Sequence, residues 1–189
     1  MTFNNIVDLL NELSVGYEIG KLQSWRQKNK GRKRAIGRKI FWRSTTKEKY
    51  AFHYGGRTEI QFNIGFDLLE KFRYGIAFSL ETSQFFHDVE LFYPKIERYN
   101  VYVRKHRNKF DSFSGFTQKK LGVVAEYPAD VIPEEQYKNH QKKTFFFIGK
   151  YFEKNIEDFT QDDCHTILKT FDELLDLYQY VESNNSDNK

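Results

Sequence analysis

Three stretches of the chain repeat apolar residues every three or four positions, which is the spacing of a helix with one apolar side. Residues 2–14 predict a short helix with a cap at Thr2 or Asn4. Residues 88–108 predict a second helix, and the proline near its start stands where a missing amide costs least. The strongest pattern covers residues 160–181, where Thr160 and Asp163 three positions later have the spacing of a capping box, so we expect a long amphipathic helix at the C-terminal end.

Other stretches follow the period of two that indicates strands with one buried face. We expect strands around residues 40–42 and at residues 49–54, 58–66, 72–83, 121–128 and 144–152. Gly55 and Gly56 lie between the second and third of these strands, and two glycines in that place favour a tight hairpin turn. The last strand, TFFFIGKYF, is strongly apolar, which predicts a central position with both faces buried. Residues 110–120, by contrast, are predicted to form a loop.

The order of these elements predicts the fold class. We expect an α+β fold with a mainly antiparallel, strongly curved sheet packed by two or three helices, including the C-terminal amphipathic helix. A chain of 189 residues with 39% hydrophobic residues suits one domain with a substantial core. We therefore expect residues 1–182 to form a single α+β domain for nucleic-acid recognition, and residues 183–189 to be a disordered tail or the start of a linker.

Charge is distributed unevenly along the chain, and this changes the picture of its function. Twelve lysines and arginines but one acid, Glu48, lie between Lys21 and Lys49. From Glu153 onward, ten acids accompany three cations. Cations interleaved with aromatic rings offer contacts for both the phosphates and the bases of a nucleic acid. A solvated surface beside an aromatic core is the plainer explanation of the same residues.

We interpret the early basic segment as a DNA-binding arm followed by aromatic strands. The predicted nucleic-acid-binding residues are Trp25, Arg26, Lys28, Lys30, Arg32, Lys33, Arg34, Arg38, Lys39, Trp42, Arg43, His53, Tyr54, Arg57 and Tyr74. In this hypothesis the cations bind phosphates, while Trp42, Tyr54 and Tyr74 form the walls of a pocket for one extruded base. The candidates for reading the edge of that base are His53, Glu59, Gln61 and Asn63.

Several classes of chemistry lack their sequence signals. The single cysteine, Cys164, excludes an internal disulfide and a cysteine-clustered zinc site, and it favours a reducing, cytoplasmic setting. The histidines show no zinc-binding spacing, and the sequence contains no phosphate-binding loop or dinucleotide-binding motif. No apolar run is long enough to span a membrane. We therefore expect no cofactor, no bound metal and no membrane partner.

Two alternatives to a DNA-binding module stay open. A small metal-dependent endonuclease needs converging carboxylates, and Glu59 and Glu81 are the acids in suitable strand positions. The lysine that such nucleases place beside their acids is absent, so we expect nuclease activity to belong to another domain or subunit. The other alternative is a protein-interaction domain whose basic arm binds an acidic partner.

The strands IQFNIGF and FRYGIAFS, followed late in the chain by TFFFIGKYF and the helix ILKTFDELLDLYQYVE, carry a family resemblance. Their order resembles that of the N-terminal DNA-recognition domain of McrB-type modification-dependent restriction systems. The resemblance implies an α+β defence module that recognises double-stranded DNA, methylated or not, and that flips a modified cytosine out of the duplex. It also implies that cleavage belongs to a nuclease or NTPase partner domain or subunit. The basic arm of residues 28–39 is longer than this family pattern.

Overall fold

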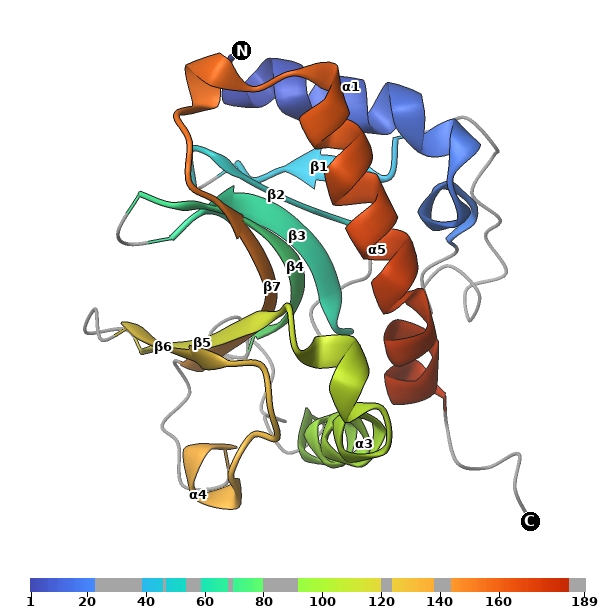
Figure 1. Ribbon diagram of the computed structural model, residues 1–189, viewed down its shortest axis with the longest axis vertical. Helices are drawn as coiled ribbons and strands as arrows, with labels where there is room; N and C mark the ends of the chain where they lie inside the picture. The colour runs from blue at the N-terminus through green and yellow to red at the C-terminus, as the bar shows by residue number, and fades with distance from the viewer. Residues whose placement is uncertain are drawn as a thin grey trace.

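The computed structural model describes residues 1–22, 39–45, 47–53, 59–67, 70–79, 92–119, 124–137 and 144–183. Within these residues, seven strands form one antiparallel sheet (Figure 1). The strands are β1 (Phe41–Arg43), β2 (Tyr50–His53), β3 (Gln61–Phe66), β4 (Phe72–Ser79), β5 (Ser114–Lys119), β6 (Val124–Pro128) and β7 (Thr144–Phe152). Their order across the sheet is β1-β2-β3-β4-β7-β5-β6, so a meander of four strands continues into β7 and the β5–β6 hairpin.

The longer helices of the described chain pack on one face of this sheet. They are α1 (Phe3–Leu13), α3 (Tyr93–Lys105) and α5 (Gln161–Glu182), and α5 contacts α1, α3 and β4 (Figure 1). Shorter helical turns lie in the connections: η1 (Ser14–Gly16), η2 (Glu18–Lys21), η5 (Arg107–Phe110), α4 (Glu134–Tyr137) and η6 (Ile156–Asp158). We call the side of the sheet under these long helices the helix face, and the opposite side the second face.

The core lies between the helix face and α5. Alternate residues of β3 and β4 point toward the helices and are buried, and they belong to one cluster with the apolar stripe of α5. The ring of Phe171 lies 5.4 Å from that of Phe41 and 5.3 Å from that of Phe62. Burial of each such ring contributes about 1.5–3 kcal/mol. This packing holds the C-terminal helix against the strands of the basic half of the chain.

The sheet bends strongly at β4 and β7, where two glycines face each other (Figure 1). A Cβ atom at Gly75 would lie 2.5 Å from the Cα of Gly149, and a Cβ at Gly149 would lie 2.3 Å from the oxygen of Tyr74. Both contacts are too close for any side chain, so glycine is required at the two positions for the strands to bend together.

Most of the elements predicted from the sequence are present. The curved antiparallel sheet and the C-terminal helix are confirmed, and the main-chain amide of Thr160 donates to Asp163 at 2.7 Å, which completes the predicted capping box. β7 lies between β4 and β5, as its apolar sequence predicted. The second helix begins at Tyr93 in the described chain. The first residues predicted for it, 88–91, and the predicted turn at Gly55 and Gly56 lie outside the described residues.

The prediction of a loop at residues 110–120 is wrong, because residues Ser114–Lys119 form β5. Serine, glycine and glutamine gave this stretch a low strand propensity. Its backbone nevertheless pairs on both sides, since Gly115 lies opposite Tyr127 of β6 and Ile148 of β7. Hydrogen bonds to two neighbouring strands outweigh the local preference.

The edge strand β1 is bound by a side chain of α1. Asn11 accepts hydrogen bonds at Oδ1 from the amides of Ile40 (2.7 Å) and Phe41 (2.8 Å). Its Nδ2 donates to the carbonyl oxygens of Phe41 and Val7, both at 3.0 Å. One amide side chain therefore satisfies three backbone groups of β1 and its lead-in residue, as a neighbouring strand would.

We predict that Asn11→Ala destabilises the protein by about 2 kcal/mol or more, because it leaves these partly buried backbone groups without a partner. Asn11→Asp retains the acceptor for the two amides and loses the donor to the carbonyl oxygens of Phe41 and Val7, so its loss should be smaller. Urea unfolding of both variants measures the difference. Equal stabilities of Asn11→Ala and the unchanged protein would contradict the role assigned to Asn11.

Candidate nucleic-acid interface

The β1–β2 hairpin presents an exposed tryptophan. Phe41 and Trp42 are neighbours in β1, so their side chains point to opposite faces of the sheet. Phe41 is buried against Phe171, whereas Trp42 is 51% exposed. Lys39 and Arg43 are also exposed, but Arg43 alternates with Trp42 and so points to the Phe41 side, where both cations approach Asp8 of α1. The edge strand thus offers an exposed indole for stacking on a base and, on its other side, two cations that can approach phosphates.

A row of side chains on the second face leads from Trp42 into the protein. Trp42 is paired with Phe52, and Phe52 is paired with Asn63, so the three side chains point to the same side. Trp42 is exposed, Phe52 is half-buried and Asn63 is fully buried. The row therefore begins with a solvent-exposed ring at the sheet edge and ends at a buried amide.

Next to Asn63 lies an arginine that the sequence analysis did not single out. Arg73 donates from Nη1 to Oδ1 of Asn63 at 2.5 Å and is almost fully buried. Its guanidinium lies 4.5 Å from the ring centre of Phe147, 5.0 Å from that of Phe145 and 5.6 Å from that of Tyr50. Burial lowers the pKa of Arg73, while the nearby Tyr50 acts against that shift. We call these five residues the arginine–ring cluster.

Alternation along β4 explains how this cluster forms. Arg73 shares the second face with Gly75 and Ala77, whose small size leaves room for a long guanidinium along the strand. A single cation that alternates with small residues in an apolar strand was therefore the sequence signal for this position. The hypothesis chose its neighbour Tyr74, which points to the other face.

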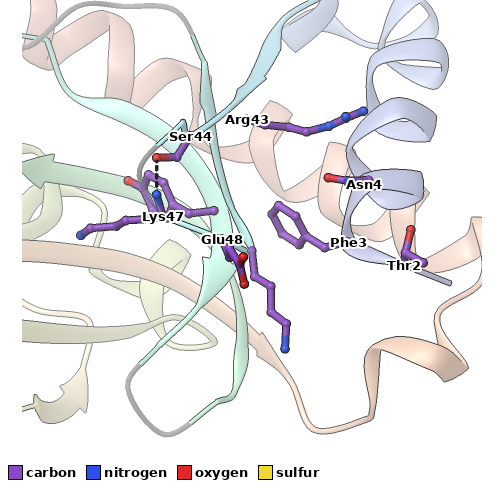
Figure 2. Close-up of a pocket in the computed structure, with 9 residues that line it drawn as sticks. Thr2, Phe3, Asn4, Arg43, Ser44, Lys47 and Glu48 are labelled. Atoms are coloured by element: carbon purple, nitrogen blue, oxygen red, sulfur yellow. Dashed lines mark hydrogen bonds between the residues drawn. The ribbon is translucent and has the colours of Figure 1, made fainter.

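The hairpin also borders a cleft at the start of α1. The cleft has a volume of about 340 Å³ and is lined by Thr2, Phe3, Asn4, Arg43, Ser44, Lys47, Glu48, Lys49 and Tyr50. Figure 2 shows Phe3 pointing into the cleft from α1, while Arg43 reaches across toward the helix. Arg43 forms an ion pair with Asp8 of α1, and Lys39 lies 3.8 Å from the same carboxylate. Two of the predicted phosphate-binding cations are thus partly neutralised by Asp8.

The structure separates the predicted binding residues into three groups. Lys39, Trp42 and Arg43 lie together at the exposed edge of the sheet. His53 and Tyr74 are only 2% and 3% exposed on the helix face, so they do not form part of a surface that a nucleic acid contacts. The remaining predictions lie outside the described residues: Trp25, Arg26, Lys28, Lys30, Arg32, Lys33, Arg34, Arg38, Tyr54 and Arg57.

Tyr74 has a structural role in the core. Its ring stacks on that of Phe152 at 4.8 Å, and burial raises the pKa of its hydroxyl to about 12. The hydroxyl therefore keeps its proton at neutral pH. Three rings were proposed as pocket walls. Trp42 faces solvent, Tyr74 is buried, and Tyr54 lies outside the described residues.

His53 and Glu59 belong to a buried network between the strands and α5. The amide of Phe62 donates to Nδ1 of His53 at 2.8 Å, and Nε2 lies 3.5 Å from Oε1 of Glu59. The hydroxyl of Tyr178 donates to the same carboxylate oxygen. Glu59 is therefore a core residue that fixes α5 against β3.

The network continues at the end of α5. Oε1 of Glu182 accepts the amide of Ile60 at 2.8 Å, and Oε2 pairs with Nζ of Lys95 in α3 at 2.6 Å. Burial raises the pKa of Glu182, while Lys95 and the Ile60 amide act in the opposite direction. The two carboxylates connect β3, α3 and α5.

A metal-dependent nuclease needs a cluster of metal-binding side chains. The part of the chain that the structure describes contains no group of three or more acids, histidines or cysteines able to hold a metal ion. Glu81, its second predicted ligand, lies outside that part.

Cys164 is buried in α5, and burial raises its thiol pKa to about 11, which disfavours the reactive thiolate. Among the described helices, none is long and apolar enough to cross a membrane.

Comparison with models of protein families, with curated proteins and with solved structures finds no match to this chain.

We predict that the Glu182→Gln variant gains stability relative to the unchanged protein as pH rises from about 4 to 7. A raised pKa means that the folded state binds the proton more tightly than the unfolded state, so ionisation of Glu182 above its ordinary pKa of 4.5 opposes folding. Gln retains an oxygen for the Ile60 amide and does not titrate.

Urea unfolding at several pH values measures this change, and Glu173→Gln, a half-exposed acid of the same helix, is the matched control. A difference between Glu182→Gln and the unchanged protein that stays constant with pH would contradict the prediction.

Proposed function

We propose that this chain is a DNA-binding recognition module in which the basic segment of residues 21–49 binds phosphates and Trp42 stacks on a base. The observation that carries the proposal is the exposure of Trp42 on edge strand β1, in the segment that holds twelve cations and one acid. A half-exposed tryptophan contributes less to folding than a buried one, because part of its ring stays in contact with water. Stacking on a base is a physical reason for this position.

The distribution of charge supports the same orientation. Exposed acids of α5, such as Asp162 and Asp176, lie on the helix side of the molecule. A polyanion is therefore less attracted to that helix than to the basic segment. The edge of the sheet at β1 is then the favoured place of contact.

We assign base stacking to the second face. The row from Trp42 through Phe52 to Asn63 joins an exposed ring to the arginine–ring cluster. Asn63 and Arg73 are as buried as His53 and Tyr74, so they support the row from inside the protein. The exposed ring of Trp42 and the half-buried ring of Phe52 are the members of the row on which a base can stack.

The proposed biological setting is restriction or defence in the cytoplasm, with double-stranded DNA, methylated or not, as the ligand. The order of strands and closing helix that resembles the McrB-type recognition domain supports this setting. The burial of Glu59 in a hydrogen-bonded network favours a module whose cleavage partner is a separate nuclease or NTPase domain or subunit.

We predict that Trp42→Ala weakens DNA binding by about 1–3 kcal/mol through the loss of one stacked base, and that it reduces discrimination between sequences or between methylated and unmethylated duplexes. Fluorescence anisotropy with labelled duplexes measures both effects. Tyr180→Ala, which removes an exposed ring from α5, is the control and should bind as the unchanged protein does. Equal affinities for Trp42→Ala and the unchanged protein would remove the support for a stacking site.

We predict that reversing Arg32, Lys33 and Arg34 to Glu weakens binding to all duplexes alike and lowers the salt dependence by about 0.9 in slope for each lost phosphate contact. The control reverses three exposed cations elsewhere, Arg104, Lys105 and Lys169, and changes the net charge by the same amount. An equal loss in both triple variants would show that overall charge, and not the basic segment, determines binding.

A further inference from the structure

We infer that the cleft between α1 and the β1–β2 turn binds a phosphate group of the nucleic acid, with Lys49 as its central cation. The inference rests on the proposed function and identifies one contact of that interface. It is based on the shape of the cleft, the cations that line it and the backbone conformation of Lys49.

The cleft offers cations at its rim and rings on its walls. Nζ of Lys47 lies 5.8 Å from the ring centre of Tyr50, and Nζ of Lys49 lies 5.1 Å from that of Phe66. Both lysines are exposed, so their ammonium groups stay hydrated and accessible. A ring face positions an ammonium group through its electron-rich centre, and the ammonium remains able to bind an anion.

Other groups around the cleft determine its net field. Arg43 is already paired with Asp8, so its charge is largely compensated, and Glu48 places one negative charge at the rim. The first turn of α1, at Phe3 and Asn4, adds amide groups that no helical carbonyl accepts. The remaining excess charge is small and comes from Lys47 and Lys49, which suits a single phosphate.

The backbone at Lys49 is strained. Its φ angle is 54°, in the left-handed region that glycine adopts easily and that other residues rarely occupy. Glycine would relieve the strain at this position, yet the chain carries a lysine, which lines the cleft. A strained residue that lines a charged cleft indicates a functional reason for its side chain.

The size of the cleft also fits this ligand. Its volume of about 340 Å³ lies at the lower end of the range for ligand sites, which is enough for one nucleotide and too small for a folded partner. The cleft and Trp42 adjoin the same edge strand, because Trp42 directly precedes Arg43 and Ser44. One DNA strand along this edge would contact both.

Glu70 provides a matched control, because its φ angle of 59° places the same strain in the turn between β3 and β4. Glu70 does not line the cleft. Exchange of either residue for glycine relieves the backbone in the same way, but only the change at Lys49 removes a cation from the cleft.

The test measures melting temperature, duplex affinity and the salt dependence of affinity for Lys49→Gly and Glu70→Gly. We expect Lys49→Gly to melt no lower than the unchanged protein, to bind duplex DNA several-fold more weakly and to lose about 0.9 in salt slope, the value of one phosphate contact. Glu70→Gly, which removes an acid outside the cleft, should bind at least as tightly as the unchanged protein, and Glu48→Gln should bind more tightly because it removes the acid at the rim. If Lys49→Gly binds as Glu70→Gly does, the inference is overturned while the proposed function stands.

A second measurement separates the two claims. Deoxyadenosine monophosphate is titrated into ¹⁵N-labelled protein, and the backbone signals of residues 2–4 and 43–50 are followed. If the unchanged protein shows no duplex binding at low salt, the proposed function fails. Shifts at these residues that disappear in Lys49→Gly would still support a phosphate site in the cleft, and no shift in the unchanged protein would overturn it.

Discussion

The packing of α5 against one face of the sheet is the interaction on which the rest of the structure depends. Phe171 and Tyr178 reach the rings of β1 and β3, and the same helix contacts α1, α3 and β4. At its start Asp163 joins Thr160 and Lys154, and at its end Glu182 joins Ile60 and Lys95. Because the long described helices share one face, the main core lies on that side. The second face carries the arginine–ring cluster instead.

Two neighbouring residues show how far periodicity alone can lead. Alternation in β4 places Arg73 and Tyr74 on opposite faces, and this much follows from the sequence. Which of the two faces lies under α5 is decided by contacts with a helix about ninety residues later in the chain, so the sequence hypothesis selected the ring that is sealed in the core. The helices, the capping box and the central apolar strand were predictable because their signals are local. β5 was not, since its pairing depends on β6 and β7.

Several residues of the proposed interface occupy positions that are unfavourable for folding. Trp42 lies on a strand of three residues, whose pairing on one side is with β2 and on the other with the side chain of Asn11. Lys49 occupies a backbone conformation that glycine would adopt at lower cost. Arg43 forms an ion pair with Asp8, and this pair holds the hairpin to α1. The exposed edge thus gives up some folding energy for the placement of rings and cations, a compromise that is common at binding sites.

The amide of Asn11 also has a consequence for the behaviour of many copies of the protein. An uncovered edge strand is a template on which another chain can add a strand and begin an aggregate. Asn11 occupies hydrogen-bonding positions of β1 that such an intruder would need, and at the opposite edge β6 ends in Pro128, which has no amide hydrogen to donate. Each margin of the open sheet thus lacks some of the hydrogen-bonding positions that an added strand would use, while the tryptophan at one margin stays accessible.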